Sequence, residues 1–135
     1  MPFARITIAD ENLAPDIQQR LATGVTELLE QDLLKEPEVT VVHTNLVPTD
    51  RWFVDHAERH PDTTGAHLEV SITAGTNTAQ EKAAFLEHAY ALLGDTLGTI
   101  PATVYVAIIE LDGEAYGYNG ISQLARRRQT ERAHA

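Results

Sequence analysis

Apolar and polar residues follow an ordered pattern through the first part of the chain. They alternate over residues 3–9, as in a strand that buries one face. Apolar side chains then recur at helical spacing over residues 17–33, just after Pro15, a residue that suits a first helical turn. Pro37 interrupts this spacing, and the β-branched residues within 39–45 are typical of a second strand. The pattern predicts a strand, a helix and a strand.

The same succession returns in the second half. Apolar and polar residues alternate over residues 67–73, and the polar stretch at 75–78 is typical of a helix cap. Apolar positions at helical spacing follow within 85–93, and Pro101 precedes a strand pattern over 104–109. The chain therefore predicts two strand–helix–strand units.

The sequences of the two halves align without a gap when the first is shifted by 64 positions. This shift places Ile6 on Val70 and Pro37 on Pro101, and the apolar class and helix phase mostly agree. Two copies are too few for a solenoid, which favours one domain with internal pseudo-twofold symmetry. The predicted domain, residues 1–135, comprises repeats at 2–54 and 66–118, a linker at 55–65 and a C-terminal tail at 121–135.

The repeated unit predicts an α+β fold in the order βαββαβ, with two antiparallel helices on one face of a four-stranded sheet. Strands within each half are expected to run parallel, because a helix separates them. We expect the other face of the sheet to carry Ile6, Ile8, Val70 or their neighbours. An open apolar face must be buried, so the fold predicts self-association.

Composition narrows the possible functions. The length of 135 residues and the hydrophobic content of 43% suit one globular domain, and the absence of cysteine excludes disulfides and thiolate metal sites. No segment predicts a membrane span and no signal peptide is recognised, so we expect a cytoplasmic protein. The net charge of −10 argues against nucleic acid as a partner, and Arg126, Arg127 and Arg128 are interpreted as a solvated end. An anionic substrate would need local cations of its own.

The histidines give no metal site. His56 and His60 lie four positions apart, a spacing that suits metal binding on a helix, but Pro61 and the flanking charges favour an irregular connection. His43 lies in a predicted strand, where it is either packed, exposed to solvent or a second acid or base. No metal and no cofactor are predicted.

Met1 and Pro2 stand directly before the first strand. A small penultimate residue such as proline usually permits removal of the initiator methionine, which would leave Pro2 with a free secondary amine. Such an amine, fixed at the end of a core strand, is a candidate base, acid or nucleophile. If Met1 is retained, Pro2 contributes only an amide nitrogen without basicity.

Several motifs resemble those of the tautomerase superfamily, whose chains begin Met-Pro and contain one or two βαβ units. Residues 101–106 and 116–120 are similar to the Pro-x-x-Val-Tyr and Gly-Trp-Asn motifs of the macrophage migration inhibitory factor type. Residues 35–43 resemble the Lys-x-Pro and Val-His of that type, whereas residues 47–53 are similar to the Val-Pro-x-x-x-Trp of the short 4-oxalocrotonate tautomerases. With Pro2, these motifs cover nearly the whole chain, which is identified as a two-repeat member of the superfamily.

The resemblance implies a cofactor-free tautomerase that moves a proton between carbon and oxygen of an enol or α-keto acid. Pro2 would be the general base, and Lys35 and Tyr105 occupy the positions of the family's active-site lysine and of a tyrosine that lines a neighbouring subunit's pocket. Burial and a nearby cation both lower the pKa of an amine, which brings it into the range that a general base needs. The resemblance also implies a homotrimer in which residues 116–119 pair with a neighbour's edge strand.

The residues that would bind the substrate match the family pattern only in part. Arg51 suits bidentate binding of a carboxylate and Trp52 an apolar wall, although both also fit a surface arginine and a packed aromatic. The family arginine at a helix start is replaced by Asn12 and Thr76. The short tautomerases' mid-strand arginine is replaced by Val41 and Tyr105, and the asparagine two residues after the family tyrosine by Ala107. The remaining cations for a carboxylate are Lys35, Arg51 and, from a partner chain, Arg126 or Arg127.

Two other functions remain open. Relatives that hydrate, dehalogenate or decarboxylate small three-carbon acids share the proline, and here Glu110, Asp112 or Glu114 could supply the acid that such chemistry needs. A non-catalytic binding or signalling protein of the same fold is favoured if Met1 is retained. The intact mass of the protein separates this last function from the other two.

Overall fold

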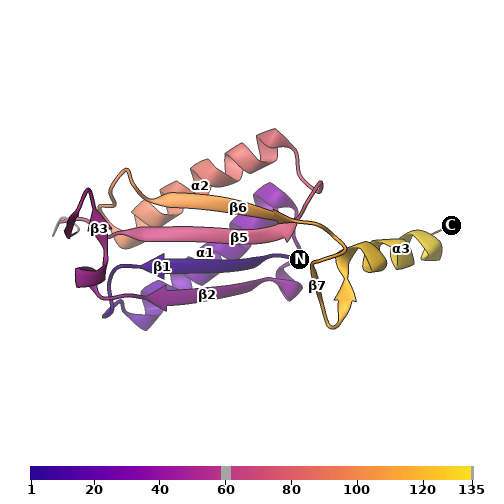
Figure 1. The fold of residues 1–135 in the computed structure, drawn as a ribbon, viewed down its shortest axis with the longest axis horizontal. Helices are drawn as coiled ribbons and strands as arrows, with labels where there is room; N and C mark the ends of the chain where they lie inside the picture. Colours follow the sequence, from indigo (N-terminus) through magenta and orange to yellow (C-terminus); the bar gives the residue numbers. More distant parts are fainter. Residues whose placement is uncertain (59–61, 135) are drawn as a thin grey trace.

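The two strand–helix–strand patterns form one four-stranded sheet with the order β2-β1-β5-β6 (Figure 1). The computed structural model describes residues 1–58 and 62–134. The strands are β1 (Phe3–Ile8), β2 (Val41–Leu46), β5 (Ala66–Thr73) and β6 (Tyr105–Leu111). β1 is parallel to β2, β5 is parallel to β6, and the halves meet where β1 runs antiparallel to β5. The predicted α+β fold is confirmed.

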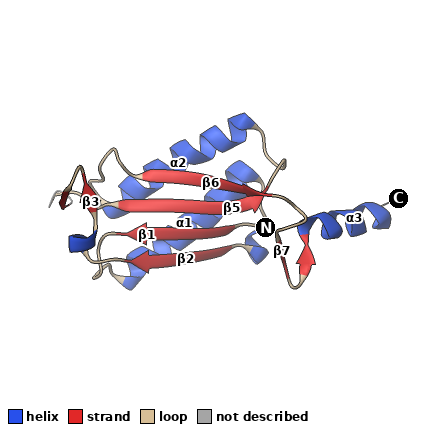
Figure 2. Ribbon diagram, in the orientation of Figure 1, coloured by secondary structure: helices blue, strands red, loops and turns tan. Residues whose placement is uncertain are grey.

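Two long helices cover one face of this sheet (Figure 2). α1 (Pro15–Leu33) begins with the predicted proline in its first turn and is followed by Leu34, whose φ of 60° is left-handed. α2 (Ala79–Leu97) begins after Thr78, which accepts a hydrogen bond from the Glu81 amide and donates its own amide to the Glu81 carboxylate. The polar entry predicted to cap this helix therefore does so.

The hydrophobic core lies between the sheet and these helices. Alternate residues of β1 and β5 pack against one stripe on each helix, and the fully buried set includes Ile6, Ile8, Leu68, Val70, Leu21, Val25, Leu29, Phe85 and Leu93. Of the two sets expected on the open face, Ile6, Ile8 and Val70 face the helices instead, and their neighbours lie on the open face, because the helix stripes bury the more apolar face of each strand.

The open face of the sheet carries the neighbours of those core residues, and it is mixed in character. Arg5 and Glu69, on adjacent antiparallel strands, form an ion pair of 3.1 Å. Val41 is 53% exposed and Tyr105 is 71% exposed on the edge strands. Polar pairs thus alternate with exposed apolar side chains on this face.

Short elements fill the remaining segments. Two 3-10 turns, η1 (Pro37–Val39) and η2 (Thr49–Arg51), flank β2, and the segment predicted as a linker contains the hairpin strand β4 (Ala57–Glu58), paired with β3 (Phe53–Val54). A second hairpin pairs β7 (Gly117–Tyr118) with β8 (Ile121–Ser122).

The segment predicted as a tail contains a helix, α3 (Gln123–Ala133), which extends away from the sheet beside the N-terminus (Figure 1). The Ser122 hydroxyl caps it by accepting a hydrogen bond from the Ala125 amide. No residue of α3 is buried, so the helix lacks the apolar stripe by which a sequence reveals a helix. Among the helices of the described residues, none is both long and apolar enough to cross a membrane.

Candidate active site

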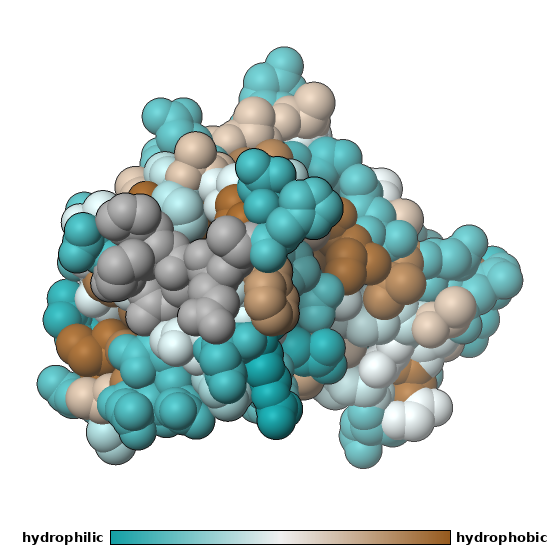
Figure 3. Space-filling model, turned by 60° about the vertical axis from the view of Figure 1, so that its left-hand side comes forward, coloured by the Kyte–Doolittle hydropathy of each residue, from teal (hydrophilic) through white to brown (hydrophobic). Residues whose placement is uncertain are grey.

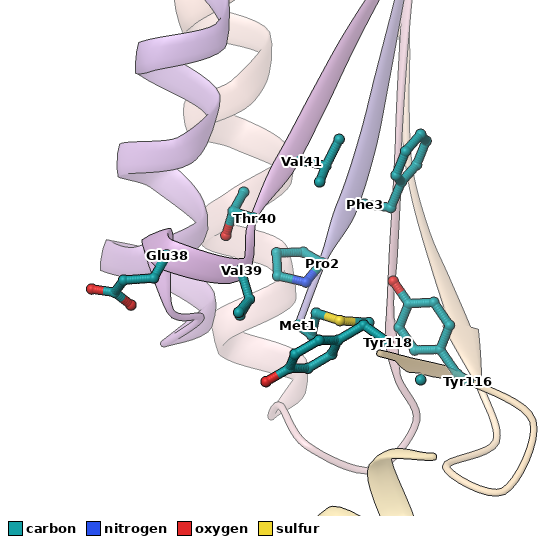
Figure 4. A pocket seen from close by; sticks show the side chains of 10 residues that line it. Met1, Pro2, Phe3, Glu38, Val39, Thr40, Val41, Tyr116 and Tyr118 are labelled. Atoms are coloured by element: carbon teal, nitrogen blue, oxygen red, sulfur yellow. The ribbon is translucent and has the colours of Figure 1, made fainter. Parts of the chain in front are cut away.

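The start of the chain forms one wall of an apolar cavity. Pro2 is fully buried directly before β1, and the cavity beside it has a volume of about 450 Å³ (Figure 4). Its lining comes from the chain start and the first residue of β1, from η1 and the start of β2, and from β7 with the residue that precedes it. The lining residues are Met1, Pro2, Phe3, Glu38, Val39, Thr40, Val41, Tyr116, Gly117 and Tyr118.

Parallel pairing of β1 with β2 explains this arrangement. Phe3 lies opposite Val41, and the Val41 amide donates to the Pro2 carbonyl at 3.3 Å, so both strands begin at the same end of the sheet. Tyr116 closes the cavity from the other side, and its hydroxyl donates to the Ser71 carbonyl at 3.1 Å. Burial raises the pKa of Tyr116, partly offset by a hydrogen bond from the Phe3 backbone, so that this phenol stays neutral. The sequence placed Tyr116 in a motif but gave it no site role.

Lys35 reaches the N-terminus from the end of α1. The left-handed Leu34 turns the chain there, and the Lys35 ammonium donates to the Thr76 hydroxyl at 2.9 Å. Burial lowers the pKa of Lys35, and Arg127 lowers it further, whereas Glu81 and Glu110 oppose these effects. Burial also lowers the pKa of the N-terminal amine on Met1, with Lys35 as the second cause, and Glu36 opposes both. The structure thus places the chain start and Lys35 together, the arrangement that a weakly basic amine requires.

Two smaller cavities lie around Lys35, and α3 contributes to both. Their volumes are about 230 and 210 Å³, and Met1, Lys35, Gln123 and Arg126 line each of them. The Arg126 guanidinium lies 3.8 Å from the centre of the Tyr118 ring, and its Nη2 donates to the Tyr118 carbonyl at 2.8 Å. The sequence offered Arg126 and Arg127 only from a partner chain, whereas here they belong to the chain that supplies Lys35.

Arg51, Trp52 and Tyr105 lie at the opposite end of the sheet. Arg51 ends η2, after β2 has run its full length away from Pro2, and Tyr105 begins β6 opposite His67. The Trp52 ring packs so closely on Gly65 that a Cβ there would meet the ring at 2.3 Å. Figure 3 shows this end of the molecule, where the visible surface is largely hydrophilic with separate hydrophobic areas. Within one chain, these three residues do not meet Pro2.

The other candidate acids and bases do not line the apolar cavity. Glu110 accepts a hydrogen bond of 2.7 Å from Lys82, which is the main reason that its pKa is lowered. Asp112 accepts a hydrogen bond from the Glu114 amide in a turn after β6. His43 is exposed on edge strand β2.

Metal-binding residues do not gather in the part of the chain that the structure describes. No three His, Asp or Glu side chains within residues 1–58 and 62–134 lie where they could hold a metal ion. His56 lies in the turn between β3 and β4, and His60 falls outside the described residues.

Comparison with known proteins places this chain in a family. No family model matches the chain. However, the "Probable tautomerase K2" of Dickeya dadantii (strain 3937) is 40% identical over 52 residues, which are 38% of this chain and 78% of that relative. The chain belongs to the tautomerase family. The match has about the length of one repeat, as expected if a tautomerase unit occurs twice here.

Solved tautomerase-like structures share the fold of this tautomerase-family chain over nearly its full length. Pt0534 inactivated by 2-oxo-3-pentynoate superposes with a TM-score of 0.82 at 18% identity, covering 92% of this chain and 98% of that one. A fused 4-OT, solved as a symmetric trimer, superposes with a TM-score of 0.79 at 18% identity, covering 92% of this chain and 98% of that one. N1, a member of the cis-3-chloroacrylic acid dehalogenase family, superposes with a TM-score of 0.79 at 19% identity, covering 98% of this chain and 92% of that one. The family fold therefore occurs with more than one chemistry.

Proposed function

We propose that this protein is a cofactor-free tautomerase that moves a proton between the oxygen and a carbon of an enol or α-keto acid. Pro2 is its general base once Met1 has been removed. The observation that carries the proposal is the chain start beside Lys35, where burial and a cation both lower the pKa of a terminal amine, at the mouth of an apolar cavity.

The proposed reaction needs only a neutral secondary amine and a stabilised oxyanion. The Pro2 nitrogen takes the proton from the enol hydroxyl, and the electron pair left on oxygen forms the carbonyl. The double-bond electrons then take the proton back from Pro2 at the carbon, which restores the amine. Lys35 stabilises the negative charge that develops on oxygen during this transfer.

Water-adding chemistry is less favoured by the same cavity. Hydration or dehalogenation needs a carboxylate that activates a water molecule. Glu38 is the one acid among the described residues lining the apolar cavity, and its carboxylate points away from Pro2 (Figure 4). Tautomerisation needs no such carboxylate.

Replacing Lys35 tests the proposed base. In the protein without Met1, Lys35→Gln removes the cation that lowers the pKa of the amine, so this pKa rises. Because the base acts only when unprotonated, the acidic limb of kcat/KM for enol ketonisation should move to higher pH. The measurement is the pH profile of the spectrophotometric decay of an enol such as that of phenylpyruvate.

Lys82→Gln is the matched control for this test. It removes the same charge, but Lys82 is paired with Glu110 and does not contribute to the pKa of the chain start. Its acidic limb should coincide with that of the unaltered protein. An acidic limb that stays in place in Lys35→Gln would contradict the role of Pro2 as the titrating base.

The assembly is proposed to be a homotrimer. Pro2 and Tyr105 lie at opposite ends of the sheet, so Tyr105 can reach a Pro2 only in another copy of the chain. In the trimer, Tyr105, Arg51 and Trp52 of one chain border the site of the next, and residues 116–119 pair with a neighbouring edge strand. The fused 4-OT relative was solved as a trimer, which supports this arrangement.

Sedimentation equilibrium measures the assembly directly. At micromolar concentration, the mass should be three times the 14.8 kDa of one chain. A mass of one chain at that concentration would contradict a site shared between chains, because Tyr105 could then not lie near any Pro2.

A further inference from the structure

We infer that Arg126 of α3 binds the substrate carboxylate and that Met1 separates this cationic site from the apolar cavity until it is removed. The substrate would then be a monocarboxylic acid with a bulky apolar group. Its description as an enol or keto acid rests on the proposed tautomerase function, whereas the carboxylate site does not.

Met1 is the wall that the cavities share. It lines the apolar cavity of about 450 Å³ and also both cavities around Lys35, of about 230 and 210 Å³. Its side chain lies beside the Tyr118 ring, at the edge of the group that surrounds Pro2 (Figure 4). Removing Met1 would therefore join the apolar cavity to the cationic space, with the Pro2 nitrogen at the junction.

The cationic side is built for an anion. Lys35, Arg126 and Arg127 line the cavity of about 230 Å³, together with Met1, Gln123 and three threonines, and none of its described lining residues is Asp or Glu. The whole chain has a net charge of −10, so a cavity with three cations and no acid is opposite in sign to the rest of the protein. This local charge attracts an anionic group to a protein that would otherwise repel it.

Arg126 has a buried donor available for that anion. Its guanidinium is fixed by the Tyr118 ring and by the hydrogen bond from Nη2 to the Tyr118 carbonyl. Its Nε, however, is buried and finds no hydrogen-bond acceptor among residues 1–58 and 62–134. A buried donor without a partner is unfavourable, and a carboxylate at Nε would satisfy it with a charge-assisted hydrogen bond.

The two sides together define the substrate class. Phe3, Val39, Val41 and Tyr118 offer apolar walls to a ring or a branched chain, while the cations lie beyond Met1 on one side of that cavity. A carboxylate at Arg126 and an apolar group among these side chains would place the carbons between them at Pro2. The chemistry fits a 2-keto acid, or its enol, with a large apolar substituent.

Calorimetric titration separates the carboxylate from the apolar group. The probes are 3-phenylpropanoate and its neutral analogue 3-phenylpropanamide, added to protein whose intact mass shows that Met1 is absent. Arg126→Gln should weaken binding of the carboxylate by about tenfold or more, the effect of losing a charged hydrogen bond, and should leave the amide unchanged. Arg128→Gln, the same charge change on an exposed residue of α3, should leave both unchanged.

A second comparison leaves α3 untouched, in case Arg126→Gln detaches the helix. Protein that retains Met1, made with the methionine aminopeptidase inhibited, should bind 3-phenylpropanoate at least about tenfold more weakly than protein without Met1, because Met1 occupies the junction. Equal binding by the two forms, or equal losses in Arg126→Gln and Arg128→Gln, would overturn the inference.

Turnover distinguishes this inference from the proposed function. Carboxylate binding that depends on Arg126 without any enol turnover would support the carboxylate site and reject Pro2 as a base. Turnover with an unchanged KM in Arg126→Gln would retain the tautomerase and overturn the role of Arg126.

Discussion

Protein that retains Met1 is expected to show no tautomerase activity, whereas the same chain without Met1 converts the enol of phenylpyruvate into the ketone. With Met1 attached, the Pro2 nitrogen is an amide that cannot accept a proton. Loss of a positioned general base lowers turnover by about 100-fold or more. The measurement is the rate of enol decay for the two forms, each identified by its intact mass.

The controls for this experiment concern folding and substitution. Both forms should give the same sedimentation and circular dichroism, because the core lies between the sheet and the helices and does not include Met1. Pro2→Ala is a weaker test, since it leaves a primary amine at the same place. Full activity of the form that retains Met1 would disprove the role of Pro2 and favour the non-catalytic alternative.

Gly117→Ala is expected to disrupt the hairpin that positions Tyr118 and Arg126. A Cβ on Gly117 would lie 2.1 Å from the Ile121 carbonyl oxygen, and that atom belongs to the partner strand of the hairpin. Backbone cannot yield as a flexible side chain does, so β7 and β8 must separate. We expect a loss of about tenfold or more in kcat/KM, since misplacement of binding groups by an ångström has effects of this size.

Gly113→Ala is the matched control in the segment that precedes this hairpin. Its Cβ would lie 3.4 Å or more from its neighbours, an ordinary contact, so activity should be close to that of the unaltered protein. Amide hydrogen exchange should show faster exchange at the Tyr118 hairpin in Gly117→Ala alone. Equal activity of the two variants would mean that the hairpin does not position the site.

The sequence predicted the fold because the apolar residues of the core recur at regular spacing along the strands and helices. Alternation in the strands and the helical stripe ending at Leu33 are both direct consequences of burial against a single core. The sequence prediction left open whether Ile6, Ile8 and Val70 or their neighbours lie on the outer face of the sheet, and the structure places the neighbours there. The outward positions of β5, which are His67, Glu69 and Ser71, are polar, so the more apolar face of this strand is the one that meets the helices.

The site was less predictable than the fold. Proximity of Lys35 to the chain start follows from the resemblance, and the structure shows it. α3 escaped prediction since it buries no residue, and the position of Arg126 depends on a hairpin of two-residue strands. Tyr105 was assigned to the site from family position and Arg51 from its capacity to bind a carboxylate, and one chain alone cannot bring them to Pro2.

The absence of buried residues in α3 means that, in the proposed carboxylate site, substrate choice and folding depend on different side chains. Substitutions in a core change packing and binding at once, because the same side chains serve both. In α3, a change at Arg126 or Arg127 alters the charge offered to a ligand without opening a space beneath the sheet. If Arg126 binds the substrate carboxylate as proposed, substitutions along α3 would change the acids that the protein accepts at little cost in stability.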